Sequence, residues 1–160
     1  MKNTLLIALV WLCGSLFATE PTLVYLVRHA EKVDQSKDPD LSARGFERAE
    51  ELAVFFEKVP IHALYASQYQ RTQKTLTPIA VAKQLQPFII DAGSPEDLVN
   101  RVKQKTGRTI LIAGHSNTLP DLIKRLGGPE LTIDDAEYRN IFLLILSEGK
   151  TTLQQLQSVR

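Results

Sequence analysis

The chain has 160 residues, of which 44% are hydrophobic and 23% are charged, and its formal net charge at pH 7 is +1. This length predicts one domain with a substantial core, and this composition is ordinary for a globular protein. No stretch gathers five or more lysines and arginines, which excludes the electrostatic footprint of a nucleic-acid-binding protein. An anionic ligand would therefore depend on a small local group of cations.

The N-terminal residues differ in kind from the rest of the chain. A lysine gives a positive start, the residues from Leu5 to Phe17 are almost all apolar, and small or polar residues begin at Ala18. This layout predicts a secretory signal peptide over residues 1–18 and a single domain over residues 19–160. Because a membrane span needs about 20 apolar residues, an uncleaved anchor is the less favoured alternative, and no stable membrane insertion is expected after cleavage. The expected location is the periplasm or the outside of the cell.

The first apolar run of the predicted domain ends abruptly at two polar residues. Residues 23–27 predict a short strand buried on both faces, and Arg28 and His29 follow it directly. Residues 109–113 repeat this arrangement, and this second strand leads to His115. In open α/β sheets, ligands bind outside the carboxyl ends of the strands. The two histidines therefore lie where a functional site is expected.

Short apolar runs and helical patterns alternate along the rest of the chain. A helix is expected to begin at the N-cap Ser42 and to stop at Pro60, and a later helix is expected to be kinked or broken at Pro78. Two further helices are expected to start at Ser94 and Thr118. The remaining expected strands cover residues 63–66, 88–90, 141–146 and 151–157. This order predicts an α/β fold, namely a three-layer α/β/α sandwich with a mainly parallel sheet and a C-terminal antiparallel hairpin.

Four segments of the sequence resemble the motifs of the histidine phosphatase superfamily, the phosphoglycerate mutase-like proteins, and they occur in that family's order. The segments are Leu26-Val27-Arg28-His29-Ala30-Glu31, Asp40-Leu41-Ser42-Ala43-Arg44-Gly45, Ser67-Gln68-Tyr69-Gln70-Arg71-Thr72 and Gly114-His115-Ser116-Asn117. The resemblance extends from about Leu23 to Gly128, which is most of the expected mature chain. Four motifs in order on an alternating β/α pattern are a specific signal, whereas Arg-His alone is a weak one.

The resemblance implies a phosphoryl-transfer site that uses no metal and no other cofactor. His29 would be the nucleophile that forms a covalent phosphohistidine, and His115 would take part in catalysis and in phosphate binding. Arg28, Arg71 and Asn117 would hold the phosphate as well, unless Asn117 only orients the loop of His115. The residue types suit this chemistry, because arginine presents several permanently charged donors and a neutral imidazole attacks phosphorus.

A general acid is needed to protonate the leaving group and then to activate water. In the family this group is usually a Glu or Asp between the third and fourth of these motifs, where the candidates here are Asp91, Glu96 and Asp97. Asp91 is preferred because it ends an expected strand, whereas helix capping explains the other two. Glu31 is a substitute candidate, and some compact members of the family have no dedicated acid.

These features predict an exported phosphatase that acts on a small phosphorylated substrate, either a phosphomonoester such as an envelope sugar phosphate or a phosphohistidine. Hydrolysis is preferred to mutase activity because the short chain leaves no room for large insertions. Three alternatives stay open: a catalytically silent phosphate- or anion-binding module on the same fold, a metal site formed by His29, Glu31 and His115, and a salt-bridge role for Arg28. The sequence specifies no oligomeric state.

Overall fold

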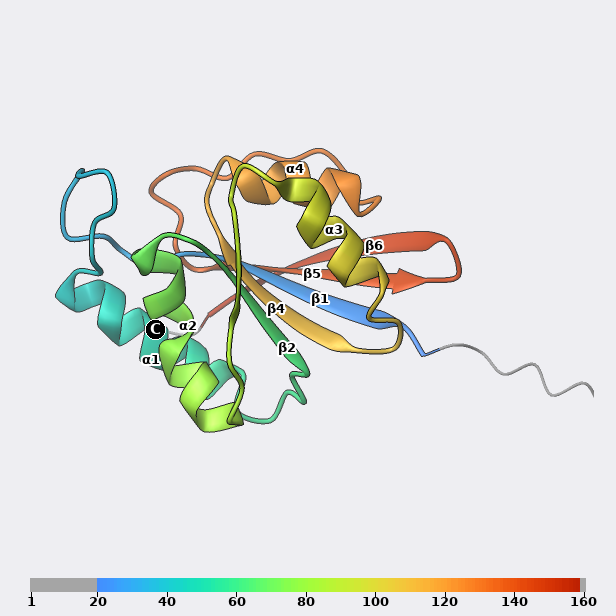
Figure 1. Ribbon diagram of the computed structural model, residues 1–160, viewed down its shortest axis with the longest axis horizontal. Coiled ribbons are helices and arrows are strands. Elements are labelled where there is room, and N and C mark those ends of the chain that lie inside the picture. The colour runs from blue at the N-terminus through green and yellow to red at the C-terminus, as the bar shows by residue number, and fades with distance from the viewer. Residues whose placement is uncertain (1–19, 159–160) are drawn as a thin grey trace, which may run out of the picture.

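The structure is a computed structural model that describes residues 20–158, so the expected signal peptide lies outside the described residues. Strands and helices alternate in the order predicted from the sequence (Figure 1). The strands are β1 (Thr22–Arg28), β2 (Ala63–Ser67), β3 (Phe88–Ile90), β4 (Thr109–Gly114), β5 (Asn140–Ser147) and β6 (Lys150–Gln157). The helices are α1 (Ala43–Phe55), α2 (Gln70–Lys83), α3 (Pro95–Lys103) and α4 (Thr118–Arg125).

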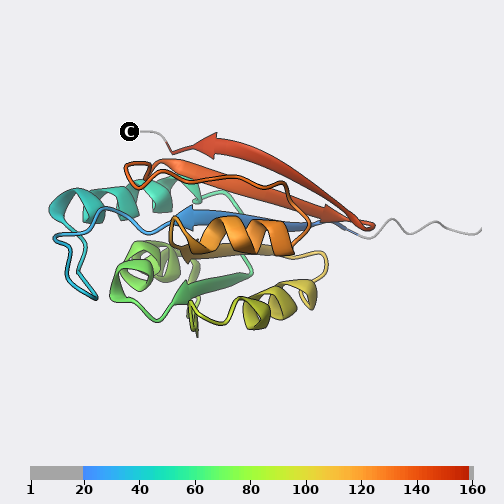
Figure 2. The ribbon, with the colours of Figure 1, turned by 90° about the horizontal axis from the view of Figure 1, so that it is seen from above.

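The six strands form one sheet in the order β3-β2-β4-β1-β5-β6. The first four strands in this order run parallel to one another, whereas β5 pairs antiparallel with both β1 and β6. The β5–β6 hairpin forms one edge of the sheet (Figure 2). Its turn contains Glu148 and Gly149, which both have positive φ. The predicted mainly parallel sheet with a C-terminal antiparallel hairpin is therefore confirmed.

Helices cover both faces of the sheet, which gives the three predicted layers (Figure 1). Because successive strand residues point to opposite faces, each central strand supplies side chains to two cores. In β1, Val24 and Leu26 belong to the core that contains residues of α3 and α4, whereas Val27 belongs to the core that contains residues of α1 and α2. Burial on both faces explains why residues 23–27 of this strand form an uninterrupted apolar run. No helix within residues 20–158 is long and apolar enough to span a membrane.

The second helix is continuous at its proline. α2 continues through Pro78, so of the two expectations for this proline the break is wrong, whereas the kink stays a prediction. The proline removes one backbone donor from the helix, but Leu76 and Ile79 on either side of it are buried in the core and hold the helix on the sheet. Tertiary packing therefore overrides the local signal.

The side chains at the three predicted helix starts differ in the hydrogen bonds that they make. Ser42 caps α1 as predicted, because its hydroxyl accepts a hydrogen bond from the Gly45 N–H at 3.1 Å. Ser94 directly precedes α3 but makes no side-chain capping bond. Thr118 is the first residue of α4, and its hydroxyl accepts a bond from the His115 N–H at 3.1 Å. Thr118 thus ties the start of α4 to the strand end at which His115 lies.

Candidate active site

The register between β1 and β4 places the two histidines side by side. The strands are parallel with Arg28 opposite Gly114, so each histidine is the first residue after its strand. The His29 N–H donates to the Gly114 carbonyl at 2.9 Å and extends the pairing by one residue. The ring centroids of His29 and His115 are 5.3 Å apart, and the two residues are only 4% and 6% exposed. The sheet itself therefore brings both rings to its carboxyl edge.

A polar cleft of about 600 Å³, open to solvent, lies around these two rings. Its lining residues are Arg28, His29, Lys32, Gln35, Arg71, His115, Ser116, Asn117, Asp135 and Tyr138. The cleft thus brings together every predicted catalytic and phosphate-binding residue except Asp91. Three cationic side chains line it against one carboxylate, so the cleft favours an anionic ligand.

The His29 ring is held in one tautomer. Its Nδ1 lies 2.7 Å from the Ala30 carbonyl oxygen, which only accepts, so Nδ1 carries the proton and Nε2 keeps its lone pair. Burial lowers the pKa of His29 to about 4; the Ala30 hydrogen bond opposes this shift, and the charges of Arg28, Arg71 and Lys32 reinforce it. At neutral pH the ring is neutral and has a free nitrogen that can act as a nucleophile.

His115 is anchored to the end of β2 by a chain of hydroxyl groups. Its Nε2 lies 2.9 Å from the Ser67 hydroxyl, which lies 2.8 Å from the Thr72 hydroxyl. The Thr72 hydroxyl donates to the Tyr69 carbonyl at 2.8 Å. Burial, followed by the charge of Arg71, lowers the pKa of His115 to about 3. The chain of hydroxyls fixes the Nε2 side of the ring and leaves Nδ1 next to Arg71 Nη2, at 3.4 Å.

Arg71 reaches the cleft from the first turn of α2. Its guanidinium carbon lies 4.4 Å from the centroid of the Tyr69 ring, which supports the flat group from one side. Its Nη1 lies 3.7 Å from Asp38 Oδ1, which is an ion pair but is too long for a hydrogen bond. Within the described residues this buried nitrogen has no hydrogen-bond partner, so it is a donor that a bound anion can engage.

Arg28 is held by an acidic loop, residues 134–138, that precedes β5. Its Nη1 donates to the carbonyls of Asp134 at 3.3 Å and Asp135 at 2.5 Å. Its Nη2 lies 3.3 Å from Asp135 Oδ1, and its guanidinium carbon lies 4.2 Å from the centroid of the Tyr138 ring. Arg28 therefore forms a salt bridge, which was one of the alternatives, and lines the cleft as well.

Glu31 does not line the cleft but pairs with a buried arginine of α1. Arg48, which is 5% exposed, donates from Nε at 2.9 Å and from Nη2 at 2.7 Å to the Glu31 carboxylate. Gly45 permits this approach of α1, because a Cβ at that position would lie 2.2 Å from the Glu31 carbonyl oxygen. The second motif thus needs its glycine for packing. The ion pair of Glu31 holds α1 against the chain that follows β1.

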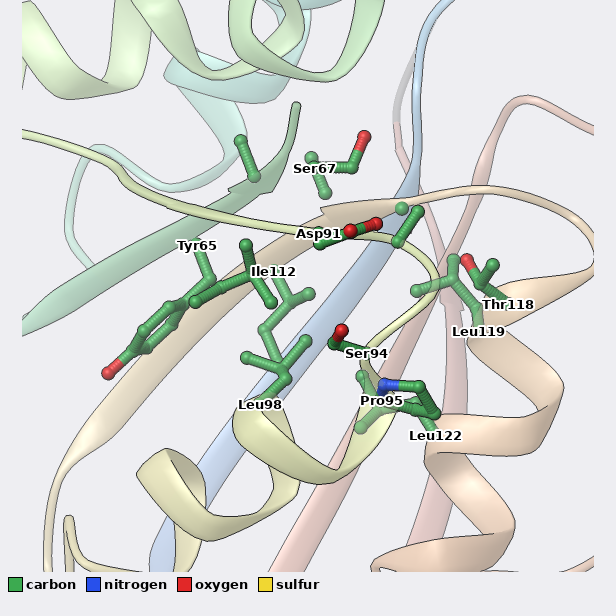
Figure 3. A pocket seen from close by; sticks show the side chains of 15 residues that line it. Tyr65, Ser67, Asp91, Ser94, Pro95, Leu98, Ile112, Thr118, Leu119 and Leu122 are labelled. Atoms are coloured by element: carbon green, nitrogen blue, oxygen red, sulfur yellow. The ribbon is translucent and has the colours of Figure 1, made fainter. Parts of the chain in front are cut away.

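Asp91 lies outside the cleft. It follows β3, which β2 and β4 separate from β1, and a strand spacing of about 4.8 Å puts the ends of β3 and β1 roughly 14 Å apart. Asp91 instead lines a neighbouring, mainly apolar pocket (Figure 3). Its Oδ1 accepts from the Gly93 N–H at 2.8 Å and from Gln68 Nε2 at 3.2 Å. The structure does not bring Asp91 together with the histidines, and its role as general acid stays a prediction.

The remaining acidic candidates are engaged elsewhere. Glu96 and Asp97 form ion pairs with arginines of α4 and α3 on the surface. In the part of the chain that the structure describes, no group of three or more His, Cys, Asp or Glu side chains is arranged to hold a metal ion. Glu31, the third ligand in the metal alternative, turns to Arg48 instead of joining His29 and His115.

Five lining residues of the cleft were not predicted from the sequence. They are Lys32, Gln35, Ser116, Asp135 and Tyr138. Lys32 and Ser116 adjoin or belong to motif segments, so their place in the chain is a signal that points to them. Asp135 and Tyr138 carry no such signal, because they reach the cleft only where the acidic loop lies over Arg28.

Comparison with protein families supports the motif assignment. The model of the histidine phosphatase superfamily (branch 1) matches residues 24–96, which contain the first three of the four motifs. No curated protein matches the sequence.

Solved structures with the same fold span almost the whole of the described chain. The protein histidine phosphatase SixA in complex with tungstate has a TM-score of 0.68 at 19% identity and covers 85% of this chain and 97% of its own. Alpha-ribazole phosphatase from Shigella flexneri has a TM-score of 0.70 at 20% identity, with coverages of 85% and 96%. Phosphoserine phosphatase from Entamoeba histolytica in complex with 3-phosphoglyceric acid has a TM-score of 0.68 at 18% identity, with coverages of 87% and 98%. At these identities the likeness shows the fold.

The family match, the shared fold and the motifs that supply lining residues of the cleft are consistent with one another. The fourth motif lies outside the matched residues, yet the register of β4 against β1 places its histidine next to that of the first motif. The chain therefore matches the histidine phosphatase superfamily over residues 24–96 and shares the fold of the phosphatases named above.

Proposed function

We propose that the chain is a phosphatase that hydrolyses a small phosphorylated substrate through a phosphohistidine formed on His29. The observation that carries the proposal is the tautomer of His29: the Ala30 carbonyl holds the Nδ1 proton, and Nε2 keeps its lone pair in a cationic cleft. The presence of a protein histidine phosphatase and a phosphoserine phosphatase among the proteins of the same fold supports it.

The cleft supplies positioning and charge for two displacements at phosphorus. Arg28, Arg71 and His115 bind the phosphate oxygens, and His29 Nε2 attacks phosphorus while the leaving group departs in line with it. Splitting the hydrolysis in this way replaces one difficult displacement by two easier ones. Water then attacks the phosphohistidine and releases phosphate. The permanent charges of the two arginines stabilise both transition states without a metal ion.

Hydrolysis is favoured over transfer to a second site of the substrate. The connection between β3 and α3 spans only residues 91–94, and the cleft is open to solvent. Short connections leave a phosphohistidine in contact with water, whereas a mutase must exclude water from the same intermediate. The proposed reaction is therefore hydrolysis of a phosphomonoester or of a phosphohistidine.

Export of the protein is the second part of the proposal. The apolar run from Leu5 to Phe17 supports a signal peptide, and a periplasmic or secreted enzyme would meet envelope sugar phosphates. Cell fractionation tests this: the protein is expected in the periplasm or medium with its N-terminus near Thr19. Recovery in the cytoplasm with Met1 intact would contradict export.

The competing function is a catalytically silent phosphate-binding module, which the same arginines would support. Purified protein is incubated with p-nitrophenyl phosphate, a sugar phosphate and a phosphohistidine peptide, with and without EDTA. Turnover of at least one substrate is expected, unaffected by EDTA and lost in His29→Ala. His62→Asn is the matched control, because His62 lies outside the cleft and accepts from the Thr109 N–H at 3.0 Å. Phosphate binding without turnover would favour the module, and inhibition by EDTA would favour a metal site.

A further inference from the structure

Asp135 supplies the one carboxylate that lines the cleft within residues 20–158. Its Oδ1 accepts from the Ser116 hydroxyl at 2.6 Å and lies 3.3 Å from Arg28 Nη2. Its side chain is 84% exposed, whereas His29 is 4% exposed. Asp135 therefore lies at the mouth of the cleft and His29 at its floor.

We infer that Asp135, rather than Asp91, is the group that exchanges a proton with the leaving oxygen and with the attacking water. This inference rests on the proposed phosphatase function and adds a catalytic residue to it. In an in-line displacement the leaving oxygen lies opposite the nucleophile. Because the nucleophile His29 lies at the floor, the leaving group points to the mouth, where Asp135 is held beside the residue that follows His115.

The two steps, phosphorylation of His29 and its hydrolysis, balance in bonds and protons with water as the only other reactant. In the first step His29 Nε2 forms a bond to phosphorus, the bond from phosphorus to the leaving oxygen breaks, and that oxygen takes the proton of Asp135. In the second step the Asp135 carboxylate takes a proton from water as the water oxygen attacks phosphorus. The bond from phosphorus to Nε2 breaks, its electron pair returns to His29, and Asp135 is again protonated.

The ion pair with Arg28 explains how a carboxylate at this position is switched between its two forms. In the free protein the Ser116 hydrogen bond and the charge of Arg28 hold the pKa of Asp135 below its usual range, with smaller effects of Lys32 and His29. A bound phosphate accepts hydrogen bonds from the Arg28 guanidinium and brings negative charge next to Asp135. Both effects raise the pKa of the carboxyl and favour proton uptake in the substrate complex.

A simpler role for Asp135 is competition with phosphate for Arg28. A proton donor and a competing anion predict opposite results when the charge is removed. Without its proton donor, the enzyme should lose activity on substrates with poor leaving groups. Without a competing anion, it should bind phosphate more tightly and lose no activity.

The test compares kcat/KM of wild type and Asp135→Asn on p-nitrophenyl phosphate, whose leaving group needs no proton, and on an alkyl phosphate, whose leaving group does. We expect Asp135→Asn to lower kcat/KM about 100-fold on the alkyl phosphate and less than about threefold on p-nitrophenyl phosphate. Glu137→Gln is the matched control: it removes a carboxylate from the same loop, one that accepts from Asn140 Nδ2 instead of lining the cleft, and should retain both activities. Asp91→Asn should likewise treat the two substrates alike.

Three results would overturn the inference: equal losses on both substrates, which indicate that Asp135 only positions Arg28; unchanged kcat/KM with tighter inhibition by inorganic phosphate, which indicates competition; and a selective loss on the alkyl phosphate in Asp91→Asn. Failure of the proposed function looks different. In that case wild type itself would not turn over p-nitrophenyl phosphate, or His29→Ala would turn it over equally well.

Discussion

At His29 a single backbone carbonyl decides which ring nitrogen keeps a free lone pair. The Ala30 oxygen accepts the Nδ1 proton at 2.7 Å, and Nε2 is therefore the only ring nitrogen that can attack phosphorus. His115 is fixed from the other side, because the Ser67 hydroxyl lies 2.9 Å from its Nε2. The two rings are thus held through different nitrogens. His29 is bonded at Nδ1 and keeps Nε2 free, whereas His115 is bonded at Nε2 and has its Nδ1 next to Arg71.

Removing the charge of Arg71 should raise the pKa of His115. Burial is the largest cause of its lowered pKa of about 3, and the charge of Arg71 is the next. In Arg71→Gln the histidine should titrate at a higher pH, which NMR of the imidazole signals measures. Arg101→Gln removes a surface arginine of α3 that pairs with Asp97, and should leave His115 unchanged. An identical His115 pKa in wild type and Arg71→Gln would contradict this account.

Replacing Gly45 should destabilise the fold through the contact with the chain that follows β1. A Cβ at this position would lie 2.2 Å from the Glu31 carbonyl oxygen, so either α1 or the chain after β1 must move. Gly45→Ala should lower the free energy of unfolding by about 2 kcal/mol or more, measured by urea denaturation. Gly93→Ala is the control, because its Cβ would meet its nearest neighbour, Asp91 Oδ1, at 3.4 Å. Equal stability of the two variants would show that α1 adjusts freely.

The sequence predicts single residues where a motif or a strand end marks them. Arg28 and His29 follow an apolar run, and such an ending is enough to identify them as candidates. Asp135 and Glu31 show the opposite case. Asp135 reaches the cleft through a loop whose path depends on tertiary contacts with Arg28, and the partner of Glu31 is an arginine of the following helix. Neither contact leaves a periodic pattern in the chain.

Among the elements, β1 and β4 position the two histidines of the cleft. Their parallel register pairs Arg28 with Gly114, and the residue after each member of this pair is a histidine of the cleft. The sequence predicts both strands, because each contains a short apolar run that polar residues follow. It does not predict that β3 lies at the edge of the sheet, with β2 and β4 between it and β1. Strand order depends on long-range pairing, and for this reason Asp91 was expected in a cleft from which it is absent.

The proline within α2 is a second case in which the packing of a whole element outweighs the local signal of one residue. Pro78 costs the helix one hydrogen bond, and this cost is offset by the burial of its neighbours Leu76 and Ile79. Pro78→Ala should raise the free energy of unfolding by about 1 kcal/mol, since the restored N–H outweighs the greater freedom of the unfolded chain. Val81→Ala, at a position that is 74% exposed on the same helix, should change stability by only a few tenths of a kcal/mol. A Pro78→Ala protein less stable than wild type would refute the prediction.

For the whole molecule, the two buried histidines make stability depend on pH. Their pKa values are about 4 and about 3 in the folded protein and 6.5 in the unfolded chain. Between pH 6.5 and these lower values the unfolded chain binds more protons, so the free energy of unfolding rises with pH and falls on acidification. Urea denaturation at pH 7, 5.5 and 4.5 should show this loss. His29→Gln/His115→Gln should flatten the curve, and a wild-type curve that is already flat would contradict the two pKa values.

The alternation of strands and helices predicted the three-layer architecture, because each apolar strand must be covered on both faces. The site at the carboxyl edge followed from the same reasoning. The rest of the cleft lining depends on contacts between segments far apart in the chain, above all on the acidic loop over Arg28.

The central claim is a phosphoryl group carried by His29, and it is tested most directly by trapping that intermediate. The protein is mixed with a phosphomonoester, quenched at alkaline pH to preserve phosphohistidine, and digested for mass spectrometry. The account predicts a phosphorylated peptide that contains His29, absent from His29→Ala and retained in His62→Asn. Turnover with no phosphoryl group on His29, or turnover that survives His29→Ala, would contradict it.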